Sequence, residues 1–291
     1  MMHRPAYRRF TSSIWVFCVV AQSTLLCFAP IRMQTARAVP PSQTIFSEDA
    51  KGWLSFPNYQ LMTAHFDKTQ WGIVLQDPKM GPFRKQLRQQ FNAQLATTEN
   101  RLGVRINELS GVATGEIATA AFQWGGEKNL QRGFALIADI TNNQAAAKQL
   151  LTQITQSLQK KGANISRISL AESAADHIKA ELKDKNLQIR GIEYYLNAEI
   201  LIATDHPLLL DDILARLKNP TANPNSLGKC DAFQTVQQQL DKAAPNLQSD
   251  AQWFVVPLDY AAIIRDANEE PRRRRRDRIK VLQRQGFDSV Q

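Results

Sequence analysis

The sequence predicts an α+β protein in which a largely antiparallel sheet is flanked by long amphipathic helices. Two neighbouring stretches, residues 116–124 and 132–140, alternate in polarity and are separated by GGEKNLQ, a pattern typical of a β-hairpin. The next stretch, residues 141–162, places leucine and isoleucine at helical spacing. The chain has 291 residues, 43% of them hydrophobic, and is long enough to bury one or two cores.

The first 38 residues have the composition of an export signal. A basic segment, MMHRPAYRRF, precedes a mostly apolar stretch at residues 13–29, which Gln22, Ser23 and Thr24 interrupt. A transmembrane helix usually needs about 20 consecutive apolar residues, so this stretch is short for a stable membrane span. It is typical of the apolar part of a signal peptide.

Small residues at Ala36 and Ala38 form the pattern that signal peptidases recognise, which predicts cleavage between Ala38 and Val39. We therefore expect a protein of the periplasm, the cell envelope or the exterior. An uncleaved N-terminus that anchors the chain in the inner membrane is the alternative. Cys230 is the one cysteine beyond this segment, which excludes an intramolecular disulfide in the mature chain and a zinc site built on cysteines.

The first elements of the mature chain are expected in this order. Residues 39–50 form a linker, and residues 53–56 form a short strand that leads into a helix capped by Asn58. The turn residues DPKMGPF then open a long helix that ends at Gly103. Its apolar face is expected to consist of Phe83, Leu87, Phe91 and Leu95.

After the hairpin, the helix at 141–162 presents an apolar stripe and ends at Gly162. One or two strands are expected within residues 164–183, and two more on either side of the turn at Leu196 and Asn197. A helix follows, with Pro207 in its first turn, where a missing N–H is tolerated. Another helix is expected after Cys230, which is interpreted as a small apolar residue beside the helix start. The stripe of the first helix consists of Leu150, Leu151, Ile154 and Leu158.

Two segments of the chain are similar to each other. WLSFPNY at residues 53–59 and WFVVPLDY at residues 253–260 both give a tryptophan, an apolar strand, a proline and a tyrosine that opens a helix. This predicts a weak internal repeat with a truncated second copy. Residues 51–230 would then form the α+β domain, and residues 231–291 a helical region that begins a second, incomplete repeat.

The incomplete repeat would lack the sheet that covers its helices. We therefore expect the region from residue 231 onward to be less stable than residues 50–217, and its apolar side chains to be only partly buried. These side chains are Phe254, Val256, Ile263, Ile264, Ile279, Leu282 and Phe287.

Few residues indicate chemistry. His65, His177 and His206 lie in different predicted elements, so no metal site and no cofactor are expected. Ser173 and Asp176 accompany His177 as the letters of a hydrolase triad, but triads are assembled in space and need an oxyanion hole. No phosphate-binding glycine loop and no nucleophile elbow are found in the sequence. We assign no catalytic residue.

The strand that contains Glu193, Tyr194 and Tyr195 is expected to have one buried and one solvated face. This alternation is the ordinary pattern of a half-buried strand. It does not by itself indicate a site.

A run of arginines near the end of the chain is the strongest local charge. The chain carries 36 basic and 27 acidic residues, but 25 basic and 26 acidic ones remain without residues 1–38 and 272–278. The run therefore forms either a solvated helix face or a contact with anionic lipid or an envelope polymer. We do not expect nucleic acid as a partner, because the body is neutral and no aromatics alternate with the arginines. The run consists of Arg272, Arg273, Arg274, Arg275, Arg276 and Arg278.

The order of features in residues 53–115 resembles that of large, uncharacterised families of exported bacterial α+β proteins. These features are the strand that enters a helix at Pro57, the segment DPKMGPF, and LSGVATGE ahead of the hairpin. The resemblance implies a signal peptide or a single anchor, and it carries over no activity and no catalytic residue. It also implies further strands beyond Gln291.

Two functional hypotheses follow. The first is an exported, non-enzymatic binding or scaffold module of the cell envelope or periplasm. The second is an exported hydrolase with an unrecognised site. Clustered histidine, aspartate and serine in one pocket would favour the second hypothesis.

Overall fold

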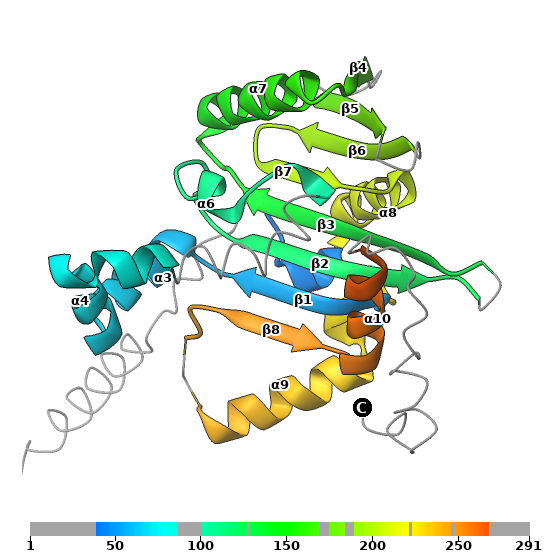
Figure 1. Ribbon diagram of the computed structural model, residues 1–291. Helices are drawn as coiled ribbons and strands as arrows, with labels where there is room; N and C mark the ends of the chain where they lie inside the picture. Colours follow the sequence, from blue (N-terminus) through cyan, green and yellow to red (C-terminus); the bar gives the residue numbers. More distant parts are fainter. Residues whose placement is uncertain are drawn as a thin grey trace, which may run out of the picture. The chain divides into compact units, whose positions relative to one another are not determined.

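One eight-stranded sheet organises the chain, in the strand order β4-β5-β6-β7-β3-β2-β1-β8 (Figure 1). Every neighbouring pair in it is antiparallel, which confirms the α+β class and the antiparallel sheet. The computed structural model describes residues 39–86, 101–126, 129–168, 175–183, 189–220, 223–245 and 248–267.

The strands and helices have the following bounds. The strands are β1 (Ala50–Phe56), β2 (Ile117–Trp124), β3 (Gln131–Asp139), β4 (Asn164–Ile168), β5 (Asp176–Lys183), β6 (Ile189–Leu196), β7 (Ile200–Thr204) and β8 (Gln252–Val255). The α-helices are α2 (Ser42–Ile45), α3 (Tyr59–Lys68), α4 (Gln70–Gln76), α6 (Ile106–Leu109), α7 (Gln144–Lys160), α8 (Pro207–Lys218), α9 (Asp231–Ala243) and α10 (Pro257–Ala267). Two short 3₁₀ helices are η2 (Pro78–Met80) and η4 (Leu227–Lys229).

The predicted hairpin is confirmed as β2 and β3, which pair from Ile117 opposite Ala138 to Trp124 opposite Gln131. Both faces of β3 are buried, because successive residues enter two different apolar clusters. Leu136 belongs to one cluster and Ile137 to the other. A strand that is buried on both faces has an almost continuous run of apolar residues, and the β3 segment GFALIAD fits this pattern.

Helices cover both faces of the sheet. On one face, α7 contributes its predicted stripe to a cluster with Phe134 and Leu136, and α10 contributes Ile263 to the same cluster. On the other face, α8 contributes Leu209 and Ile213, and α9 contributes Phe233. We call these the α7 face and the α8 face of the sheet.

Several local predictions are confirmed. The Asn58 side chain accepts a hydrogen bond from the Leu61 N–H at 2.9 Å and caps α3. Pro207 lies in the first turn of α8. Gly162 follows α7 with a φ of 89°, a conformation that favours glycine.

The predicted linker at residues 39–50 is wrong. This segment forms α2 and the start of β1, and the side chains of Ile45 and Phe46 are fully buried on the α8 face. Phe46 packs edge-to-face on Phe122 of β2, with ring centroids 5.4 Å apart. The prolines and polar residues around them gave the segment the composition of a linker, whereas its two large apolar residues anchor it.

The expectation that Phe254 and Ile263 would be only partly buried is also wrong. Phe254 is 8% exposed and Ile263 is 1% exposed. The reason is that β8 joins the same sheet as an antiparallel neighbour of β1, so this sheet covers both side chains. The boundary expected at residues 230 and 231 therefore does not separate β8 and α10 from the first domain.

The two similar segments pair with each other, since Trp53 lies opposite Phe254 and Leu54 lies opposite Trp253. Whether they derive from a repeat stays a prediction. Residues 268–291 lie outside the described residues, and so do Leu87, Phe91 and Leu95 of the predicted long helix. Within the described ranges, no helix has the length and apolar content to cross a membrane.

Candidate functional site

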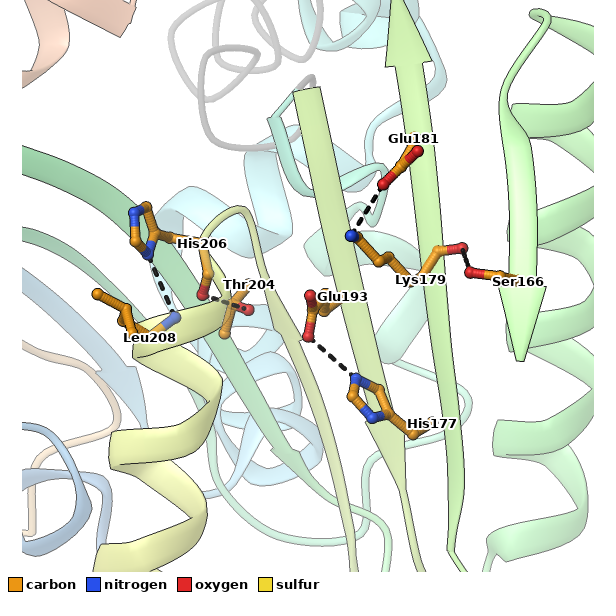
Figure 2. Close-up of polar contacts among 8 residues, drawn as sticks. All are labelled: Ser166, His177, Lys179, Glu181, Glu193, Thr204, His206 and Leu208. Carbon is orange, nitrogen blue, oxygen red and sulfur yellow. Dashed lines mark hydrogen bonds and ion pairs between the residues drawn. The ribbon is translucent and has the colours of Figure 1, made fainter. Parts of the chain in front are cut away.

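Polar side chains from four neighbouring strands align on the α8 face of the sheet. The register places Ser166 opposite Lys179, Lys179 opposite Glu193, and Glu193 opposite Thr204. Residues that are directly opposite in an antiparallel pair point to the same face, so these four side chains form one row across β4 to β7. We call these four residues, together with His177 and Glu181, the polar row (Figure 2).

His177 and Glu193 form the buried centre of the polar row. The His177 Nε2 atom lies 3.0 Å from the Glu193 Oε2 atom, and the two side chains are 11% and 9% exposed. The Nδ1 atom of His177 is buried and has no hydrogen-bond partner among the described residues. A buried histidine with a hydrogen-bond partner on only one of its two ring nitrogens is uncommon in a site that serves packing alone.

Glu193 corrects one expectation, because it is buried and does not lie on a solvated face. Tyr194, which points to the α7 face, is fully buried, and its hydroxyl donates to the Leu102 carbonyl at 2.7 Å. Burial raises the pKa of this phenol. Both faces of β6 are therefore covered at this point.

Lys179 and Glu181 extend the polar row toward solvent. The Lys179 ammonium lies 2.8 Å from a Glu181 carboxylate oxygen, and the side chains are 36% and 38% exposed. This hydrogen bond and the charge of Glu181 raise the pKa of Lys179, and the Glu193 carboxylate adds to the effect. The exposed end of the row thus presents one ammonium and one carboxylate to solvent, and the Glu193 carboxylate is buried.

His206 continues this polar region at the start of α8. Its Nδ1 atom accepts from the Leu208 N–H at 3.3 Å, so the proton is on Nε2, which lies 3.2 Å from the Gln131 side-chain oxygen. The ring packs edge-on against Trp124, with centroids 5.0 Å apart. Burial lowers the pKa of His206, and the carboxylates of Asp205 and Glu193 oppose this shift.

Asp205 is a buried carboxylate that the sequence pattern does not reveal. It accepts a hydrogen bond from the Phe134 N–H at 2.6 Å and one from Arg101 at 3.0 Å. Burial raises its pKa, whereas the Phe134 N–H and the Arg101 guanidinium lower it. Arg101 also lies over the Phe134 ring, with its guanidinium carbon 5.6 Å from the centroid. Asp205 lies directly between β7 and the start of α8, where a short acidic residue is ordinarily interpreted as an N-cap.

A second buried carboxylate, Glu116, fastens residues 39–50 to the sheet. It accepts hydrogen bonds from the Ser42 N–H at 3.0 Å and from the hydroxyls of Ser42 and Ser55. The Trp53 indole N–H donates to the Ser42 hydroxyl at 3.0 Å. All four residues are buried, so this cluster is structural.

Asp176 and His177, two of the three residues that have the letters of a hydrolase triad, have different partners. Asp176 pairs loosely with Lys148 at 3.9 Å, whereas the carboxylate beside His177 is Glu193. Ser173 lies outside the described residues. The strand neighbours Asp176 and His177 point to opposite faces, as expected for β structure.

The remaining residues singled out from the sequence lie apart from the polar row. Val39 is the first described residue and is buried, while Ala36, Ala38 and all six arginines of the run from Arg272 to Arg278 lie outside the described residues. Cys230 is a half-buried free cysteine at the start of α9, as interpreted. His65 pairs with Asp250 at 2.8 Å on the surface.

The polar row offers hydrogen-bond donors and acceptors in a fixed order, which suits a polar ligand.

Among the described residues, no group of three or more histidine, cysteine, aspartate or glutamate side chains is arranged to hold a metal ion. Comparisons of the chain with protein-family models, with curated proteins and with solved structures found no match.

Proposed function

We propose that the chain is an exported, non-enzymatic binding or scaffold module of the cell envelope or periplasm, and that the polar row contacts its ligand. The observation that carries this proposal is the pairing of the buried His177–Glu193 contact with the half-exposed Lys179–Glu181 ion pair on one sheet face. Strand positions that serve packing alone are normally apolar where they are buried. Ionisable groups that cluster in one place are candidates for a functional site.

The chemistry of the row favours a polar, hydrogen-bonding ligand. Lys179 supplies a cation with N–H donors, Glu181 supplies acceptors and Ser166 supplies a hydroxyl, and all three are accessible to solvent. Glu193 and Thr204 are buried behind them. Saccharide and peptide portions of an envelope polymer carry matching groups. Such a ligand would lie along the accessible part of the row, on β4 and β5, without any chemical step.

The experiment is a binding assay with purified peptidoglycan and with purified anionic envelope polysaccharide. Lys179→Gln combined with Glu181→Gln is expected to weaken binding at least about tenfold, because each good hydrogen bond to a charged group contributes roughly 1.5–3 kcal/mol. Lys242→Gln on α9, also exposed, serves as the matched control and should bind as the parent protein does. Unchanged binding by the double variant, or no binding to either polymer, would exclude this role of the row.

The arginine run supplies a second, separable contact in this proposal. Replacing all five of the consecutive arginines, Arg272 to Arg276, with glutamine should abolish salt-sensitive binding to anionic vesicles or envelope polymer. The thermal stability should change little, since exposed charges contribute little to stability. Binding of equal strength after the replacement would rule out the contact.

Export itself is tested by the mass of the mature protein. The predicted signal leads us to expect a mature N-terminus at Val39, in the periplasmic or secreted fraction. An intact Met1 in membrane-bound material would show that the N-terminus is not cleaved and would favour the anchored alternative.

A second candidate function, an exported hydrolase, is favoured by one observation. His177 is oriented by a carboxylate on one nitrogen, as the base of a hydrolase triad is, and its other nitrogen has no partner among the described residues. Labelling with a fluorophosphonate probe tests this function. Labelling that is lost in both Ser173→Ala and His177→Gln would support it, and absence of labelling in the parent protein would exclude a serine hydrolase.

A further inference from the structure

The segment from residue 59 to residue 86 lies to one side of the sheet, beyond the end of β1 (Figure 1). It contains α3, α4 and η2, and Gly72 is its one buried residue. A helical segment normally buries an apolar stripe against its own protein. Among the described residues, Tyr59 packs partly against the core of the α7 face, whereas most of the large apolar side chains of this segment stay exposed, so they need another explanation.

Six large apolar side chains of the segment are exposed to solvent. Single exposed apolar residues are common, but a gathering of this kind on one segment marks an interaction surface. We call this set the α3–α4 patch; it consists of Leu61 (52% exposed), Phe66 (44%), Trp71 (70%), Ile73 (61%), Val74 (46%) and Phe83 (46%).

The helices that carry the α3–α4 patch are held in a fixed arrangement. Thr69 ends α3 and caps α4 by accepting from the Gly72 N–H at 3.0 Å. Gly72 packs so closely that an added Cβ would lie 2.1 Å from the Phe66 carbonyl oxygen. Arg84 donates to the Leu75 carbonyl at 2.9 Å and ties the following turn to α4. The surface is therefore preformed, which lowers the entropy cost of binding.

The charges of the segment have a surplus of one sign. Residues 59–86 contain four basic side chains and two acidic ones, Asp67 and Asp77, which gives a net charge of +2. One of the acids is already engaged, since Asp77 accepts from the Lys79 N–H at 2.8 Å at the start of η2. The basic side chains are Lys68, Lys79, Arg84 and Lys85, and all of them are exposed.

We propose that the α3–α4 patch docks on an anionic lipid surface, with Trp71 at the level of the headgroups. Tryptophan beside aliphatic residues, on a segment that also carries exposed lysine and arginine, is the composition that enters the boundary between headgroups and acyl chains. The basic side chains match the negative surface potential of the membrane. A complementary protein surface would also cover apolar residues, but the excess of exposed cations on the segment that carries the exposed tryptophan and phenylalanines favours lipid.

This contact differs from the one proposed for the arginine run. The arginines would bind by charge alone, so salt should release them. The α3–α4 patch adds apolar insertion, which salt weakens much less. The two proposals can therefore fail separately.

The test measures fluorescence quenching of the purified chain by vesicles whose lipids carry bromine on the acyl chains. The vesicles contain phosphatidylglycerol and phosphatidylcholine in equal parts, and pure phosphatidylcholine vesicles test the charge requirement. Trp71→Phe and Trp253→Phe are the matched pair of variants, because the two tryptophans are 70% and 71% exposed on different elements. Both variants keep Trp15, which lies in the apolar N-terminal stretch and could itself be quenched by the vesicles. The readout is therefore the part of the quenching that depends on Trp71.

We expect Trp71→Phe to remove a quenched component that Trp253→Phe retains, and only with the anionic vesicles. Trp71→Ser combined with Ile73→Ser should weaken vesicle binding at least tenfold, whereas glutamine in place of the consecutive arginines should leave the Trp71 quenching in place. Equal quenching in the two tryptophan variants would overturn the proposal. A dimer in solution that the double serine variant abolishes, with no Trp71-dependent quenching, would assign the surface to a second copy of the chain instead.

Discussion

Trp53 lies opposite Phe254 across the antiparallel pair of β1 and β8, and Phe233 of α9 packs between them. The Phe233 ring is edge-on to both, with centroids 5.4 Å from Trp53 and 5.4 Å from Phe254. Three segments that are distant in the sequence therefore depend on one ring. This contact connects the last described strand to the core of the α8 face.

Removal of the Phe233 ring should destabilise the whole fold. Phe233→Ala is expected to lower the free energy of unfolding by about 3–5 kcal/mol, because the surrounding rings cannot fill the cavity. Val236→Ala on the same helix is the control, since Val236 is 40% exposed, and its cost should stay below about 1 kcal/mol. Urea unfolding monitored by tryptophan fluorescence gives both values. Similar losses in the two variants would show that α9 contributes little to this core.

The carboxylate of Glu116 should be more important for stability than an exposed acid. Glu116→Ala leaves the Ser42 N–H and the hydroxyls of Ser42 and Ser55 without their acceptor in a buried place. We expect a loss of about 2–4 kcal/mol, with a smaller loss for Glu116→Gln, which keeps one acceptor oxygen. Glu48→Ala, at an exposed position, is the control. Chemical denaturation distinguishes these variants, and equal stability of all three would show that the cluster does not hold residues 39–50 in place.

The buried ion pair of Arg101 and Asp205 should be sensitive to loss of one partner. Asp205→Ala leaves the Arg101 guanidinium and the Phe134 N–H without an acceptor, and the expected cost is roughly 3 kcal/mol. Arg101→Met combined with Asp205→Ala removes both charges and should recover part of this loss. Thermal unfolding of the single and double variants provides the check. A double variant that is less stable than Asp205→Ala alone would contradict this account of the pair.

The sequence was sufficient for the elements whose pattern is local. The hairpin at Ile117 to Asp139, the apolar stripe of α7 and the cap at Asn58 depend on neighbouring residues, and all three are confirmed. The place of β8 depends on which distant strand it pairs with, and no local pattern encodes this. A strand of four residues with one buried side chain carries too little alternation to identify its partner.

The candidate site was largely hidden for the same reason. His177 and Glu193 belong to different strands and meet because of the β5–β6 register, which sets Lys179, not His177, directly opposite Glu193. The sequence indicated a carboxylate next to His177 at Asp176, but adjacent strand residues point to opposite faces. An alternating strand also predicts a solvated Glu193 unless the neighbouring helix α8 is known to cover that face.

The final prediction concerns pH and His206. Burial lowers the pKa of His206 in the folded chain below its ordinary value of 6.5. At a pH between the folded and the unfolded pKa, the unfolded chain therefore binds a proton at His206 that the folded chain does not. The stabilising contribution of neutral His206 is therefore complete above about pH 6.5 and is lost as the pH falls toward the lowered value. The charges of the Asp205 and Glu193 carboxylates oppose this lowering of the pKa and reduce the effect. His206→Asn keeps a good N-cap for α8 and removes the titration. We expect the parent protein to lose more stability than His206→Asn between pH 7.5 and about pH 5.5, as followed by urea unfolding at each pH. Parallel stability curves for the two proteins would show that His206 is protonated equally in the folded and unfolded chains.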